Sequence, residues 1–189
     1  MQILYSILSG IGLSAACGFR IFIPFLILSI SGASGWIELN EAYVWISSMP
    51  ALIIFSVLSA AEIAGYFNPW IDNMLDTITT ALILFAGILI SLSVINDLNP
   101  FIRWSVAVIA GGGIAMNFQF LTVKARSVSS VFISGYGNLI IAALELTLSA
   151  LISFLAVFYP GASIIAVIIF SLVLHDILKK AKARLREKF

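Results

Sequence analysis

Three charged residues lie inside long apolar stretches of the sequence, where an isolated charge is costly. Arg20 stands in the segment Gly18–Pro24 of the first apolar run, Glu62 lies near the end of the second, and Glu145 lies inside the fifth. A charge at the centre of a bilayer costs about 3 to 15 kcal/mol, so each must be paired, hydrated or placed near an interface. Because arginine does not lose its proton, we predict that Arg20 lies in the interior, within pairing distance of Glu62 or Glu145.

Such a polar centre has two interpretations that the sequence leaves open. Helices from both halves of the chain meeting at these charges can bind an anion, a proton or a lipid headgroup. Alternatively, the charges form a structural ion pair that fixes how the helices are placed. Lys124, at the end of the fourth apolar run, is a further candidate for binding a substrate or ion.

A second group of polar residues follows an N-x3-D-x3-D spacing at Asn68, Asp72 and Asp76. On a helix the two aspartates share one face, and such carboxylates can hold magnesium against a diphosphate, as in membrane prenyltransferases. Those enzymes need a second aspartate motif and more membrane spans than this chain offers. We therefore favour the other interpretation, in which the carboxylates stabilise a helix N-terminus.

Conventional metal and nucleophile chemistry has little support. The single cysteine, Cys17, excludes an internal disulfide and a cysteine-based zinc site, and the single histidine, His175, excludes a multi-histidine centre. The sequence has no Walker loop and no Ser/His/Asp set. We predict no metal and no cofactor, and we do not expect an enzyme.

Composition places the chain in the membrane. Of its 189 residues 61% are hydrophobic and 10% are charged, and several apolar runs exceed the roughly 18 residues that indicate a transmembrane helix. We predict one all-α integral membrane domain over 1–189 with six transmembrane helices. Their expected ranges are 3–30, 45–67, 69–95, 100–123, 138–158 and 162–178.

Glycine and proline mark two places where these spans should depart from a straight helix. The first run would be about 42 Å long against a hydrocarbon core of about 30 Å, and Gly18 and Pro24 predict a kink or break in it. Gly111, Gly112 and Gly113 lie in the middle of the fourth run. Three successive glycines there predict a close helix crossing or an unwound turn.

Basic residues orient the spans. Eight of the ten lysines and arginines lie in Lys124–Arg126 and Lys179–Lys188. The positive-inside rule then puts the basic tail, 179–189, and both chain termini in the cytoplasm, with the protein in the cell's inner (plasma) membrane. The tail is expected to contact anionic lipid rather than nucleic acid.

The two halves of the chain, 1–97 and 98–189, have a similar plan. Each opens with a glycine-rich span, continues with a span that carries one glutamate, and ends with an uninterrupted apolar span. Three spans per half would place the second half in the membrane the other way up, as in the inverted repeats of many transporters. The alternative is that any six-span protein can be divided in two.

Three short motifs in a fixed order extend over most of the chain: Gly18-Phe19-Arg20 with Pro24, then Glu62 followed by Pro69, Asp72, Asn73 and Asp76, then Gly111-Gly112-Gly113 with Ala115 and Lys124. This order resembles the bacterial membrane family called domain of unknown function 4126. Members of that family often carry an Asp-Lys pair just before the proline, where this chain has Tyr66 and Phe67. The resemblance implies an integral membrane protein and no particular substrate.

The sequence therefore supports three functional hypotheses. The preferred one is a small transporter or channel with a polar site where the two repeats meet. The alternative is a non-transporting partner or scaffold subunit, which could be a homo-oligomer. The least favoured is a small lipid-modifying enzyme that uses Asp72 and Asp76.

Overall fold

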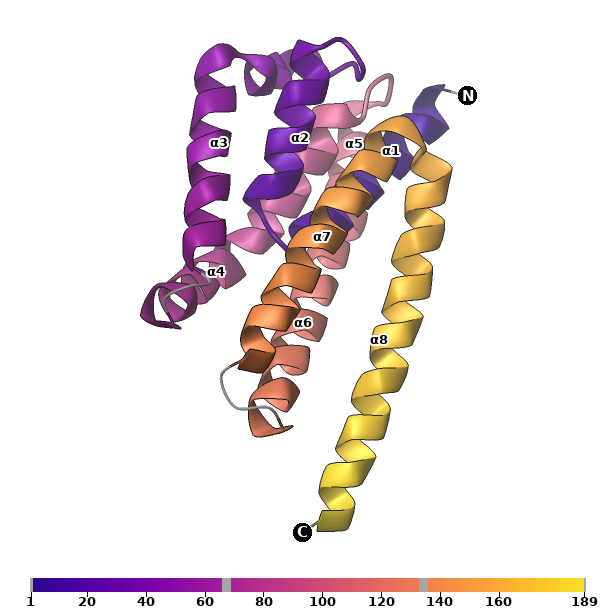
Figure 1. Ribbon diagram of the computed structural model, residues 1–189. Helices are drawn as coiled ribbons and strands as arrows, with labels where there is room; N and C mark the ends of the chain where they lie inside the picture. The colour runs from indigo at the N-terminus through magenta and orange to yellow at the C-terminus, as the bar shows by residue number, and fades with distance from the viewer. Residues whose placement is uncertain (1, 66–68, 133–135, 189) are drawn as a thin grey trace.

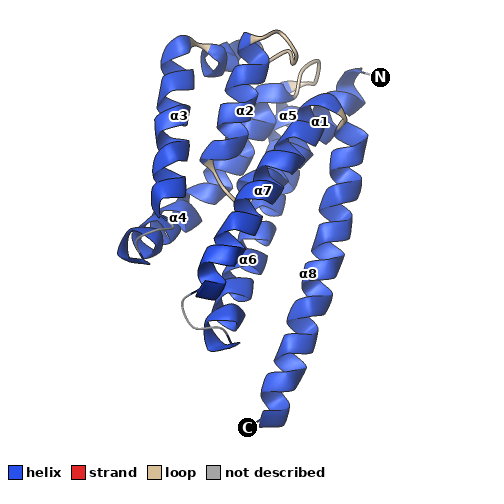
Figure 2. Ribbon diagram, in the orientation of Figure 1, coloured by secondary structure: helices blue, strands red, loops and turns tan. Residues whose placement is uncertain are grey.

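The computed structural model describes the backbone of residues 2–65, 69–132 and 136–188, and the side chains of 2–65, 81–126, 140–177, 179 and 180. The described residues form helices joined by short connections and contain no strand (Figure 2). In chain order the elements are α1 (Gln2–Cys17), α2 (Phe22–Ala33), the 3-10 helix η1 (Glu41–Ser47), α3 (Met49–Ala64), α4 (Pro69–Val94), α5 (Pro100–Val106), the π-helix η3 (Ala107–Gly112), α6 (Gly113–Phe132), α7 (Tyr136–Phe158) and α8 (Pro160–Lys188).

The first apolar run folds back on itself and does not form the expected crossing over 3–30. Helix α1 enters from one end of the bundle, and after a four-residue break α2 returns to the same end (Figure 1). Trp36, just beyond α2, packs against Phe158 at the end of α7 with ring centroids 5.3 Å apart, and one cavity is lined by both Gln2 and Trp36. The break that Gly18 and Pro24 predicted is therefore the tip of a helical hairpin.

The remaining helices run the length of the bundle in alternating directions (Figure 1). Three helical stretches among the described residues are long and apolar enough to cross a membrane: Pro100–Arg126, Ile140–Phe158 and Pro160–Ile177. The pair η1–α3, bent by 61°, makes a fourth if it counts as one span. The far end of α8 lies at the opposite end of the bundle from the start of α1, because the first run does not cross (Figure 1).

Helix α4 crosses the α5–η3–α6 helix at the predicted glycines. A Cβ added at Gly111 would lie 2.7 Å from the carbonyl oxygen of Gly87, and one at Gly112 would lie 2.9 Å from the side chains of Leu84 and Ile88. Because the close neighbour of Gly111 is a backbone atom, only glycine fits there, whereas the side chains next to Gly112 can shift. The close crossing is confirmed at Gly111 and Gly112 but not at Gly113, where a Cβ would meet nothing within 4 Å.

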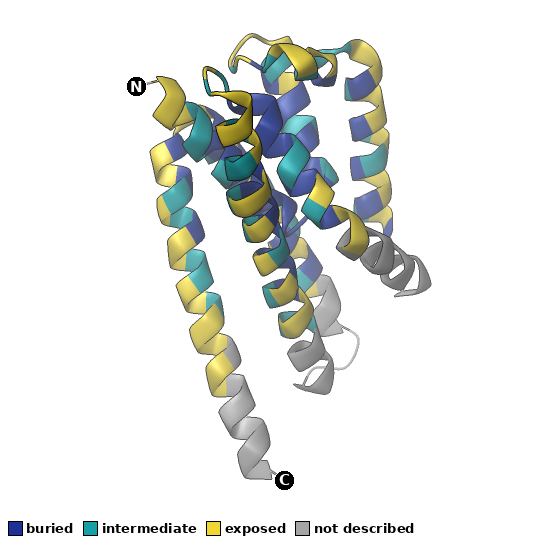
Figure 3. Ribbon diagram, turned by 180° about the vertical axis from the view of Figure 1, so that it is seen from behind, coloured by how far each residue is buried: buried dark blue, intermediate teal, exposed yellow. Residues whose placement is uncertain are grey.

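Helix α1 is the central helix of the bundle and packs against α4, α6, α7 and α8. The Ser14 hydroxyl donates to the carbonyl of Gly87 at 2.8 Å, and the Ser149 hydroxyl of α7 donates to the carbonyl of Ala16 at 3.1 Å. Small side chains allow such close approach of helices in membranes. Helix α8 is the most exposed of the three span candidates, since only 17% of its apolar window is buried (Figure 3).

The expected inverted repeat has no support in this arrangement. The opening segment of the first half, 1–97, folds back as a hairpin, whereas that of the second half, 98–189, continues as one long helix through α5, η3 and α6. An Asn-Pro pair precedes both α4 and α5, and at the second the Asn99 side chain caps α5 by accepting from the amide of Phe101 at 3.0 Å. Asn68, at the first occurrence, lies outside the described residues.

Candidate functional site

The hairpin tip, residues 18–21, is held inside the bundle by close backbone packing. A Cβ at Gly18 would lie 2.5 Å from Cβ of Phe118 and 2.6 Å from the carbonyl oxygen of Ala115, both on α6. Pro24 is buried in the first turn of α2, where a missing backbone N–H removes no helical hydrogen bond. The tip therefore lies directly against α6 and carries the side chain of Arg20 into the interior.

Arg20 pairs with a carboxylate from another helix. Its Nη2 lies 2.9 Å from Oε2 of Glu145 on α7, and the two residues are only 5% and 4% exposed. The prediction that Arg20 pairs with Glu62 or Glu145 is confirmed at Glu145. The pair joins the hairpin tip to α7, and its two residues are 125 positions apart in the chain.

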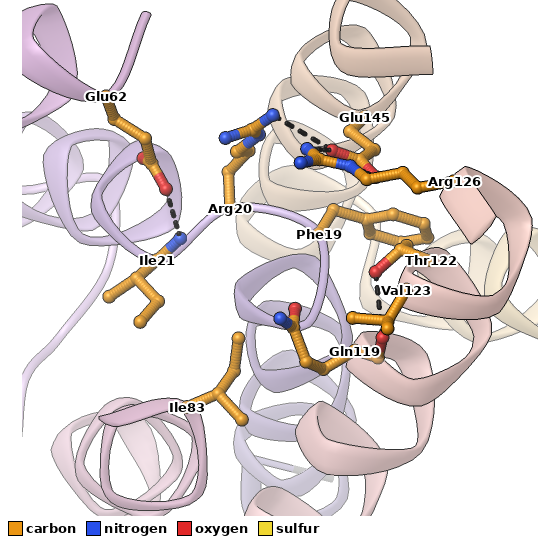
Figure 4. A pocket seen from close by; sticks show the side chains of 10 residues that line it. All are labelled: Phe19, Arg20, Ile21, Glu62, Ile83, Gln119, Thr122, Val123, Arg126 and Glu145. Carbon is orange, nitrogen blue, oxygen red and sulfur yellow. Dashed lines mark hydrogen bonds and ion pairs between the residues drawn. The ribbon is translucent and has the colours of Figure 1, made fainter. Parts of the chain in front are cut away.

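A second arginine binds the same carboxylate. The Arg126 Nε donates to Oε1 of Glu145 at 3.1 Å, and its Nη2 donates to Oε2. Arg126 lies on α6, so the tip, α6 and α7 meet at one carboxylate (Figure 4). Two guanidinium groups on one buried carboxylate form charge-assisted hydrogen bonds, which are among the strongest in proteins.

Glu62 contributes to the same cluster in another way. Its two carboxylate oxygens accept hydrogen bonds from the backbone amides of Ile21 and Phe22, at 3.2 and 3.3 Å. These amides lie at the N-terminus of α2, where the first backbone N–H groups have no acceptor within the helix. A carboxylate favours this position because the helix dipole is positive there. Glu62 therefore caps the returning arm of the hairpin, and Arg20 lies between the two glutamates (Figure 4).

The four charges enclose almost no free volume. The cavity among them measures about 10 Å³, roughly the space that one water molecule needs. Two guanidinium groups and two carboxylates balance in formal charge. We call these four residues, Arg20, Glu62, Arg126 and Glu145, the charged cluster. It is tightly packed and its formal charges sum to zero.

Sequence reasoning missed the contribution of α6. Gln119, Thr122 and Arg126 all line the cavity (Figure 4), but Arg126 had been assigned only to the basic group that ends the fourth run. A usable signal was present, because these positions are spaced by three and four residues and so share one helix face. Polar residues repeated on one face of an apolar helix indicate a polar interior.

Other candidates from the sequence do not join the cluster. Lys124 is exposed and does not line the cavity. Asn68 lies outside the described residues, and the side chains of Asp72 and Asp76 on α4 are not described either, so their binding role stays a prediction. Among the described side chains no group of three or more His, Cys, Asp or Glu residues could hold a metal ion.

A family model described as a domain of unknown function, number 4126, matches residues 7–180. No curated protein and no solved structure matches the chain. The matched region contains the hairpin from residue 7 onward, including its tip, and all four charges of the cluster.

Proposed function

We propose that this chain, which belongs to the family described as domain of unknown function 4126, is a small membrane transporter or channel whose path passes through the charged cluster. The observation that carries the proposal is an arginine at the tip of a helical hairpin, buried among carboxylates from α3 and α7. Discontinuous helices with polar ends inside the bundle are typical of transporter binding sites. Ionisable residues at such depth are usually functional, because their burial is costly.

The compact cluster corresponds to a closed state. A cavity of about 10 Å³ leaves no continuous route past Arg20, so transport requires the tip to separate from Glu145. A proton can separate them by neutralising the carboxylate, and an anion can do so by competing for the guanidinium groups. Both species are therefore the first candidates for transport.

The orientation in the plasma membrane follows from the positive-inside rule together with the fold. With the tail that begins at Lys179 in the cytoplasm, α3, α4, α5–α6, α7 and α8 make five crossings. The hairpin then enters from outside, and the chain begins outside, in place of the cytoplasmic N-terminus expected from six spans. The tail retains its proposed contact with anionic lipid.

A non-transporting partner or scaffold subunit is the second candidate. The observations that favour it are the tight packing around the charged cluster and the exposed apolar face of α8, which could contact another subunit or a second copy of this chain. A lipid-modifying enzyme would depend on Asp72 and Asp76, and nothing in the described residues supports it.

Ion flux through the reconstituted protein tests whether it is a transporter or channel or a non-transporting subunit. Liposomes that contain the purified protein and a pH-sensitive dye, or a chloride indicator, are given an outward potassium gradient with valinomycin. We expect proton or chloride flux above that of protein-free liposomes, and we expect Arg20→Lys to abolish it, since lysine cannot form the same planar hydrogen bonds.

The matched control is Arg103→Lys, the same change at an arginine on α5 that does not line the cavity. Its flux should equal that of the unaltered protein. If the unaltered protein carries neither ion above background, or if both arginine variants lose flux equally, the transport proposal is rejected in favour of the second candidate.

A further inference from the structure

A larger cavity lies at the opposite end of α1 from the charged cluster. Its volume is about 340 Å³, within the size range of small-molecule sites. The start of α1, the connection after α2, the end of α4 and the α7–α8 turn all contribute to its wall. We call it the outer cavity, because the positive-inside rule puts this end of the bundle outside the cell.

Aromatic rings form part of this wall. Trp36 and Phe158 contact each other at a centroid distance of 5.3 Å with an angle of 55° between their planes, and Tyr5 of α1 also lines the cavity. The faces of such rings attract cations, and tryptophan attracts them most strongly. Rings from three separate segments of the chain are thus available to one ligand.

The charged residues of the wall are both acidic. Glu38 follows α2 and Asp97 follows α4, and no lysine, arginine or histidine is among the described residues that line the cavity. The Asn96 side chain donates to the backbone carbonyl of Glu38 at 3.1 Å, which ties the two acidic segments together. The wall therefore favours a cation over an anion.

A small polar side chain adds a third feature. Ser9 of α1 lines the cavity, with 4% of its surface exposed. A serine hydroxyl can both donate and accept a hydrogen bond. A ligand in the cavity can therefore form a polar contact with α1.

We propose that the outer cavity binds a small organic ammonium, with its charge between the aromatic rings and the two carboxylates. A metal cation fits less well, because the wall offers two carboxylates and apolar rings instead of a closed set of oxygen ligands. The ammonium group can belong to a free amine or to the headgroup of a lipid in the outer leaflet. This site is separate from the charged cluster and does not depend on the proposed transport path.

Calorimetric titration of the detergent-purified protein with choline tests the proposal. The neutral comparison is 3,3-dimethyl-1-butanol, which has the shape of choline without its charge. We expect saturable binding of choline and none of the neutral alcohol. Trp36→Leu and Asp97→Asn should each weaken choline binding by about two- to fivefold, the size expected for one exposed cation–aromatic or charge contact.

Glu41→Gln is the matched control, since Glu41 is an exposed acid on the same side that does not line the cavity. Its affinity for choline should be unchanged. The proposal fails if choline shows no saturable binding, if the neutral alcohol binds equally well, or if Glu41→Gln weakens binding as much as Asp97→Asn.

Nanodiscs distinguish the two sources of the ammonium group. If a lipid headgroup is the natural occupant, adding phosphatidylethanolamine to phosphatidylglycerol nanodiscs should weaken choline binding by competition. If a free amine is the occupant, the two lipid compositions should give the same affinity. Both outcomes require the ammonium site, and the choline titration in detergent decides whether that site exists.

Discussion

Replacing Glu145 with glutamine removes a carboxylate that two buried arginines share. The side chain keeps its size, so the change tests charge rather than packing. Arg20 and Arg126 would then face each other with Glu62 as the remaining carboxylate of the cluster, and Glu62 is already bonded to two backbone amides. Breaking a buried ion pair by removing one partner costs about 3 to 5 kcal/mol, because it leaves a charge without compensation.

That cost should be visible in thermal unfolding of the detergent-purified protein. For a chain of this size each kcal/mol lowers the midpoint by about 2 to 4 °C, so Glu145→Gln should lower it by about 6 to 20 °C. Glu41→Gln, the same change at an exposed position, should leave the midpoint within experimental error.

A double variant separates the ion pair from other effects of the substitution. Combining Glu145→Gln with Arg20→Gln removes one charge of each sign, so the pair of changes should cost less than the sum of the two single changes. Strictly additive costs, or a shift of less than about 2 °C for Glu145→Gln alone, would show that the cluster does not hold the hairpin in place.

Three further predictions concern the hairpin. Glu62→Leu should cost about 1 to 3 kcal/mol in chemical denaturation, because two buried amides lose their acceptor, whereas Glu62→Gln keeps one acceptor oxygen and should cost less. Gly18→Ala should destabilise the protein by about 1 to 3 kcal/mol, because the added methyl group overpacks the hairpin tip. Gly113→Ala, where the added methyl group meets open space, should be neutral or stabilising. Equal effects of the two changes would contradict the close packing of the tip against α6. Cysteine labelling in intact cells should reach Gln2→Cys from outside and Lys180→Cys only after the membrane is opened, and labelling of both from one side would reject the folded-back hairpin.

Much of the fold class and of the local structure could be predicted from the residue types alone. Long apolar runs with few charges require helices in a membrane, since no water is available there to bond the backbone. The pair Asn99-Pro100 is typical of a helix start, because asparagine caps the first turn and proline is tolerated in it. The need of Arg20 for a buried partner also followed, since an arginine stays charged wherever it is placed.

Tertiary structure decided what these local rules leave open. Two apolar helices joined by a short break can continue in one direction or fold back, and the residues that the break contacts decide between the two. Here the break contacts distant residues, since Gly18 lies against Ala115 and Phe118, about a hundred residues away. The pairing of Arg20 with Glu145, and the binding of Arg126 to the same carboxylate, likewise depend on how α6 and α7 pack. Sequence periodicity tells which face of a helix is polar, but only packing between distant segments determines which polar faces meet.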